Sequence, residues 1–94
     1  MTFRDFFRMT QLAVNGRRVA VWCFDQTTAR IMLREYTAKL RGHDFKGWRA
    51  QSSNGNECVT FEGGGCVRFV SRHGHLDGAD IIYDTEDELT AYLR

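Results

Sequence analysis

The sequence predicts a single α+β domain over residues 1–94: an N-terminal β-hairpin, a long amphipathic helix, a three-stranded antiparallel meander, a further strand and a short C-terminal helix. Three observations support this prediction. The 94 residues include 43% hydrophobic and 13% aromatic side chains, which suits one packed core and excludes a disordered chain. Three glycine-containing turn signals separate runs of alternating apolar and polar residues. Between the first two signals, residues 26–41 show helical spacing of apolar residues instead.

The N-terminal hairpin is predicted from Asn15-Gly16, because these residues tolerate the positive φ angles of a type I′ turn. A two-residue loop would place four apolar residues on one face: Leu12, Val14, Val19 and Val21. A helix over the first nine residues is the alternative, since the spacing of Phe3, Phe6, Phe7 and Thr10 also fits a helical period.

The long helix is predicted from about Gln26 to Arg41. Asp25 can accept a hydrogen bond from the free amides at its start, and Gly42 is a natural residue for its end. Its apolar stripe consists of Ala29, Met32, Leu33, Tyr36 and Leu40.

The meander is predicted over residues 47–72, with turns at Asn54-Gly55 and Gly63-Gly64-Gly65. Loops of two and three residues pair Trp48 with Phe61, Ala50 with Val59, Val59 with Phe69, and Phe61 with Val67. One face then holds Trp48, Ala50, Val59, Phe61, Val67 and Phe69. The other face holds Arg49, Gln51, Cys58, Thr60, Cys66 and Arg68. A shift of one residue would mix the two faces, so their consistency favours this meander.

The end of the chain is predicted to form a buried strand over 79–83 and then a short helix. Thr85 and Glu88 have the spacing of a capping box, and Leu89, Tyr92 and Leu93 would form the apolar side of the helix. Residues 72–78 are expected to form a loop.

The formal net charge of +1 hides an asymmetry. Residues 1–72 hold 12 of the 13 Lys and Arg and six of the 12 Asp and Glu, a net charge of +6, whereas residues 73–94 carry −5. Such a division can mark a basic surface suited to phosphates, or simply solvated faces and an acidic helix cap.

The composition favours a cytoplasmic protein (of the host cytoplasm, if the chain is phage-encoded) with no membrane partner. No apolar run is long enough for a membrane span, and charges interrupt residues 1–10 where a signal peptide would be apolar. Three cysteines fit no disulfide framework, so reduced thiols are expected.

No catalytic residue, metal site or cofactor is predicted. The residues Cys58, Cys66, His73 and His75 are suitable metal ligands, but they lack the short spacing of structural zinc sites. A Cys/His nucleophile oriented by Asp80 or Asp84 can be drawn, yet nothing local marks an activated cysteine. The triple glycine is followed by a strand and not by Gly-Lys-Ser/Thr, which favours a hairpin over a phosphate loop.

Five arginines are the candidate residues for binding nucleic acid or a protein partner. Arg49 and Arg68 share the polar face of the meander with Thr60, where they could meet phosphates. The others, which could enlarge this surface, are Arg17, Arg18 and Arg72. The sheet aromatics fall on the core side, whereas single-strand binders usually expose some for base stacking; a merely solvated face is the alternative.

Several segments together resemble part of the ATPase domain of phage large terminase subunits. They are the strand 18–23, the helix start Gln26-Thr27-Thr28-Ala29-Arg30, the segments 53–57 and 59–64, the strand Val67-Arg68-Phe69-Val70-Ser71-Arg72, and Gly78-Ala79-Asp80-Ile81-Ile82-Tyr83-Asp84 at the place of the Walker B strand. The resemblance implies Asp84 as a metal-binding acid and Glu86 as a displaced catalytic acid. The family's Gly-x₄-Gly-Lys-Ser/Thr motif is missing, its adjacent Asp-Glu is replaced by Asp84-Thr85-Glu86, and 94 residues leave no room for its nuclease domain. ATP hydrolysis is therefore not expected.

Together these patterns predict a small, non-catalytic, phage-type accessory protein that binds a protein or nucleic acid. The alternatives are a degenerate terminase-like ATPase fragment that contacts DNA or a motor subunit, and a thiol- or metal-dependent enzyme. The two helices are expected to cover the face of Trp48, Phe61 and Phe69, because such a patch left uncovered would favour a homo-oligomer.

Overall fold

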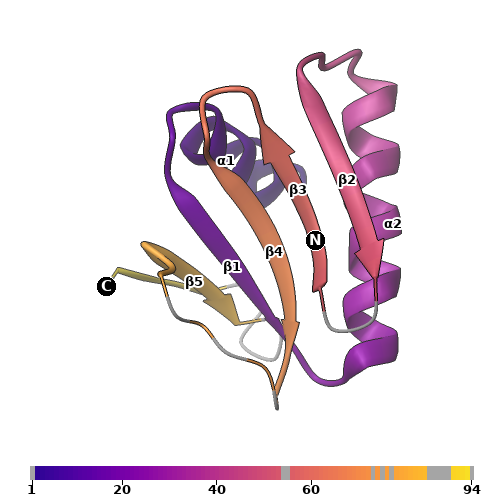
Figure 1. Ribbon diagram of the computed structural model, residues 1–94, viewed down its shortest axis with the longest axis vertical. Helices are drawn as coiled ribbons and strands as arrows, with labels where there is room; N and C mark the ends of the chain where they lie inside the picture. The colour runs from indigo at the N-terminus through magenta and orange to yellow at the C-terminus, as the bar shows by residue number, and fades with distance from the viewer. Residues whose placement is uncertain are drawn as a thin grey trace.

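The computed structural model describes residues 2–53, 56–72, 74, 76, 78–84 and 90–93. Within these residues the chain forms two helices and one six-stranded mixed sheet, which confirms the predicted α+β class. The elements occur in the order α1 (Phe3–Val14), β1 (Arg18–Cys23), α2 (Gln26–Gly42), β2 (Trp48–Ser53), β3 (Asn56–Phe61), β4 (Cys66–Ser71), β5 (Ile81–Asp84) and β6 (Thr90–Leu93) (Figure 1).

Strand β1 lies inside the sheet between two parallel neighbours. The strand order is β2-β3-β4-β1-β5-β6, and β1 is parallel to both β4 and β5. Strands β2, β3 and β4 form the antiparallel meander, and β6 is antiparallel to β5. Because β4 and β5 are parallel and lie on either side of β1, the connection between them has to cross β1.

The two helices cover one side of the sheet. The main core lies between the helices and the sheet. The helices contribute Phe6, Met9, Tyr36 and Leu40, and the strands contribute Val19, Val21, Val59, Val67 and Phe69, among others. On the other side, Ala20 and Ile82 pack against Leu76 and Ala79 of the β4–β5 connection. Leu76 and Ala79 thus cover part of β1 and β5, whereas Arg49, Gln51 and Thr60 of β2 and β3 are exposed on this side. In the described part of the chain, no helix is long and apolar enough to cross a membrane.

The predicted N-terminal hairpin is wrong, and the helical alternative is correct and extends further, to Val14. Helix α1 buries one stripe against the sheet, formed by Phe6, Met9, Thr10 and Ala13. Asn15-Gly16 closes this helix: Gly16 has a φ of 89°, its N–H donates to the Ala13 carbonyl, and the Arg17 N–H donates to the Leu12 carbonyl. A helix end of this type and a type I′ turn both need a positive φ at the glycine.

Helix α2 is confirmed, and Asp25 caps it as predicted. The Asp25 carboxylate accepts a hydrogen bond of 2.7 Å from the Thr28 N–H, and the bonds from Thr28 lower the pKa of this carboxyl. The prediction that Gly42 ends the helix is wrong. Gly42 is its last helical residue, and the left-handed position is taken by Asp44, at a φ of 58°. The Phe45 N–H donates to the Leu40 carbonyl, which completes a Schellman motif.

The meander is confirmed, with one change of register. Trp48 pairs with Phe61 and Ala50 with Val59, as predicted, although Ala50 is exposed on the outermost strand. Between β3 and β4 the predicted pairs are wrong by two residues, because Val59 pairs with Val67. The loop is Glu62–Gly64, closed by a bond from the Phe61 N–H to the Gly65 carbonyl. A shift of two residues keeps every side chain on its predicted face.

The last predicted strand is present as β5, whereas the C-terminal helix is wrong for residues 90–93. These residues form β6, which pairs Leu93 with Ile81 and Ala91 with Tyr83. An isolated helix of two turns is marginal in water, whereas a strand here pairs with the outer edge of β5. The predicted capping box of Thr85 and Glu88 lies outside the described residues, as does the Asn54-Gly55 turn.

Candidate nucleic-acid interface

The side of β2, β3 and β4 that faces away from the helices is polar, and the N-terminal end of β1 continues it. We call this surface the open face; it consists of Arg18, Arg49, Gln51, Cys58, Thr60, Cys66 and Arg68. The pairing places these residues in two rows across the sheet. One row runs from Arg49 through Thr60 and Cys66 to Arg18, and the other joins Gln51, Cys58 and Arg68.

Three of the five predicted arginines therefore share this face. Given about 4.8 Å between strands and about 3.3 Å per residue along them, the backbones of Arg18 and Arg68 lie about 8 Å apart, and those of Arg49 and Arg68 about 12 Å apart. Arg18 and Arg49 are exposed and Arg68 is half-buried. Each of the three arginines therefore has another one within about 12 Å of its backbone.

Of the two acidic residues of the meander, Glu62 is exposed at the turn after β3, whereas Glu57 lies on the opposite side of the sheet. Glu57 is buried on the helix side of β3, where its carboxylate accepts a hydrogen bond from Gln26 Nε2 and lies 3.7 Å from Arg30 Nε. Asp80 flanks the open face at its β1 end. The Asp80 carboxylate accepts a bond from the Arg18 N–H and lies 4.0 Å from Arg17 Nε. Asp80 therefore lies beside Arg18 and Arg17, whereas Arg49 and Arg68 lie further from it, on β2 and β4.

The other two predicted arginines lie apart from this group. Arg17 precedes β1 beside Asp80. Arg72 follows β4 at the opposite end of the sheet, with its guanidinium 4.4 Å from the ring centre of Trp22. The expectation that all sheet aromatics face the core is wrong for Trp22, which lies on the same side as Ala20. The alternation of Val19, Val21 and Trp22 already contained this signal.

Burial disfavours the thiolate form at two of the three cysteines. Burial raises the pKa of the Cys23 thiol to about 12 and raises that of Cys66. Cys58 and Cys66 lie diagonally on the open face, since Cys66 pairs with Thr60 and Cys58 with Arg68. No group of three or more metal-ligating residues comes together in the described part of the chain. His73 and His75 lie outside it.

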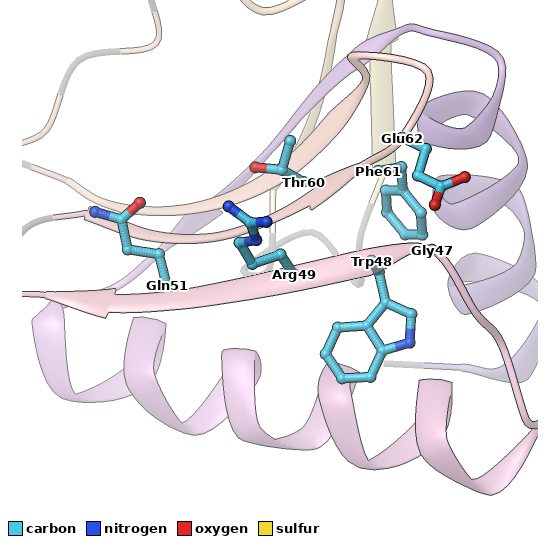
Figure 2. Close-up of a pocket in the computed structure, with 7 residues that line it drawn as sticks. All are labelled: Gly47, Trp48, Arg49, Gln51, Thr60, Phe61 and Glu62. Atoms are coloured by element: carbon cyan, nitrogen blue, oxygen red, sulfur yellow. The ribbon is translucent and has the colours of Figure 1, made fainter.

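A pocket of about 440 Å³ lies at one end of the open face, which is within the usual size range for small-ligand sites. Its polar lining comes from Arg49, Gln51, Thr60 and Glu62. Gly47, Trp48 and Phe61 complete it. Figure 2 shows Arg49 and Gln51 on one side of β2 and Trp48 on the other, toward α2. The Trp48 ring is fixed there, because its Nε1 donates to the Phe45 carbonyl and Arg41 lies over it.

Sequence reasoning missed the part that Gly47 and Glu62 play in this pocket. Gly47 continues the row of Gln51 and Arg49 without a side chain, and its φ of 74° favours glycine. Glu62 occupies the space above it, since a Cβ on Gly47 would lie 3.0 Å from the Glu62 carboxyl carbon. The spacing of Gly47 two residues before Arg49 was the available signal.

Comparison with known proteins adds no relative to this picture. No model of a protein family matches the chain, and neither the curated proteins nor the solved structures contain a match. The resemblance to terminase subunits therefore stays a prediction. The function has to be inferred from the open face itself.

Proposed function

We propose that this chain is a small, non-catalytic accessory protein that binds single-stranded nucleic acid through the open face. The observation that carries the proposal is the placement of Arg18, Arg49 and Arg68 on one exposed surface while Glu57 lies buried on the other side. Arginine is well suited to phosphate, because its planar fork donates two parallel hydrogen bonds.

The shape of the surface favours a single strand over a duplex. The open face spans four strands, or about 14 Å between the outer backbones, whereas the major groove of B-DNA is about 12 Å wide and admits a helix or a two-stranded ribbon. A duplex could touch this sheet only with its phosphates. A single strand can lie flat along it and present both phosphates and bases.

The chemistry of the surface favours nucleic acid over a protein partner. The centres of protein interfaces are depleted in charge and enriched in aromatic side chains. On the open face, the described side chains are arginines and small polar or thiol groups. The stacked pair of Trp22 and Arg72 lies on the same side of the sheet but outside the open face, where Trp22 packs with residues of the β4–β5 connection.

The first test removes two of the three charges. The double variant Arg49→Gln/Arg68→Gln is expected to bind a fluorescent 12-nucleotide thymidine strand, which offers Arg49 only phosphates, about tenfold more weakly at low salt. Loss of two phosphate contacts also makes the slope of log K against log salt shallower by about 1.4. Fluorescence anisotropy over a series of salt concentrations measures both quantities.

The matched control removes two charges from the helical layer. Arg4→Gln/Arg8→Gln changes the net charge equally on exposed positions of α1. It should leave the salt slope close to that of the wild type. An equal loss in both double variants would show that net charge alone attracts the strand, and absence of binding by the wild type at low salt would refute the proposal.

A further inference from the structure

The pocket at the end of the open face contains two opposite charges that are not paired with each other in any contact of the structure. Glu62 and Arg49 both lie on exposed positions of the lining. Gly47 precedes Arg49 by two residues in the β2 row, and the Glu62 side chain lies over Gly47, so both charges border the same pocket. The pocket therefore offers the two carboxylate oxygens of Glu62 as hydrogen-bond acceptors at one end and the guanidinium N–H groups of Arg49 as donors at the other.

The carboxylate is held near the strand end by its surroundings. Glu62 follows β3, its N–H donates to the Gly47 carbonyl at 3.1 Å, and its side chain lies over Gly47. Arg49 is two residues further along β2, which separates the two backbones by about 7 Å along the strand. A flat ligand with donors on one edge and acceptors on another can bridge this space.

We propose that this pocket binds an unpaired guanine base of the single strand that the open face holds; the inference rests on the proposed function. Guanine carries two neighbouring donors, N1–H and the N2 amine, which match the two oxygens of Glu62. On another edge it carries two neighbouring acceptors, O6 and N7, which match the guanidinium of Arg49. Adenine and thymine lack this combination, and cytosine has its donor and acceptors on a single edge.

The direct test compares oligonucleotides that differ in one base. The probes are fluorescent eight-nucleotide thymidine strands whose fourth base is guanine, adenine, cytosine, hypoxanthine or 7-deazaguanine. The guanine strand is expected to bind about fivefold to tenfold more tightly than the adenine and cytosine strands. Hypoxanthine, which lacks the N2 amine, and 7-deazaguanine, which lacks N7, should each lose most of this preference.

Two variants test which side chain contacts which edge of the guanine base. Glu62→Gln should abolish the discrimination between guanine and hypoxanthine, while it strengthens binding of the adenine strand because a negative charge is removed. Arg49→Lys keeps the charge and should abolish the discrimination between guanine and 7-deazaguanine. Asp5→Asn on α1 is the matched control for Glu62→Gln: it removes one negative charge and should keep the full guanine preference.

The possible outcomes distinguish failure of the guanine site from failure of nucleic-acid binding by the open face. Equal affinity for all five strands would overturn the guanine site and leave nucleic-acid binding intact, whereas no binding of any strand would overturn both. Guanosine monophosphate is expected to compete only weakly, since it does not use the arginines of β1 and β4. Competition at the concentration at which the strand itself binds would assign the pocket to a free nucleotide and overturn the inference.

Discussion

Replacing Gly65 with alanine is expected to lower the free energy of unfolding by at least about 3 kcal/mol, because the added methyl group would overlap backbone atoms. Gly65 is buried where the β3–β4 turn meets the end of α1. A Cβ on Gly65 would overlap the Ala13 carbonyl and lie 2.8 Å from the Arg17 carbonyl oxygen. These neighbours are backbone atoms, so no side-chain rotation can relieve the overlap.

Glycine 42 provides the matched control. It is helical, has no positive φ, and a Cβ there would meet nothing within 4 Å. Gly42→Ala is therefore expected to stabilise the protein by up to about 1 kcal/mol, because alanine has the higher helix propensity. Urea unfolding followed by circular dichroism measures both variants. A Gly65→Ala protein as stable as the wild type would show that the turn does not pack against α1 in this way.

Thr10→Val is expected to cost about 1–3 kcal/mol, more than removal of its hydrogen-bond partner. The Thr10 hydroxyl donates to the Phe6 carbonyl at 2.8 Å and lies 2.7 Å from the Tyr36 hydroxyl, with both residues buried. The Thr10 hydroxyl has a single proton, which it donates to the Phe6 carbonyl. The Tyr36 hydroxyl must therefore be the donor in its hydrogen bond with the Thr10 hydroxyl. Burial raises the pKa of Tyr36, so it keeps this proton at neutral pH.

The two single variants are therefore unequal. Thr10→Val leaves the buried Tyr36 hydroxyl without its acceptor, whereas Tyr36→Phe leaves Thr10 still bonded to Phe6. We expect Tyr36→Phe to cost only about 1 kcal/mol and the double variant to be no less stable than Thr10→Val alone. Thermal unfolding of the wild type, the two single variants and the double variant completes this double-mutant cycle. Strictly additive losses would contradict a hydrogen bond between α1 and α2.

Local signals explain which elements could be predicted from the sequence. Asp25 and the apolar stripe of α2 lie within one segment, so the helix could be predicted with its first residue. The faces of the meander also followed from alternation, because a two-residue shift does not exchange them. The Asn15-Gly16 pair was ambiguous for a physical reason: a glycine at positive φ can end a helix or close a hairpin. Packing of α1 on the sheet decides between them.

Contacts between distant segments explain what could not be predicted. Arg49 and Arg68 were placed on one face by alternation alone. Arg18 joins them only because β1 inserts beside β4 in parallel, which pairs it with Cys66. Strand β6 likewise depends on the free edge of β5. The position of the Glu62 side chain over Gly47 is a further tertiary contact, although the predicted pairing of Trp48 with Phe61 already placed Gly47 and Glu62 beside each other.

The central claim, that nucleic acid covers the open face, is tested most directly by the chain's own thiols. Cys58 and Cys66 are half-buried on this face, whereas Cys23 is buried in the core on the helix side, and burial raises its pKa to about 12. The rate of alkylation by iodoacetamide at each cysteine can be followed by mass spectrometry, with and without a saturating single strand.

We expect the bound strand to slow alkylation of Cys58 and Cys66 several-fold at low salt. This protection should be lost at high salt, because salt weakens the phosphate contacts and the strand dissociates. Cys23 should react much more slowly than either thiol in both conditions. Unchanged rates at Cys58 and Cys66, under conditions where anisotropy shows the strand to be bound, would place the nucleic acid elsewhere on the protein and contradict the account.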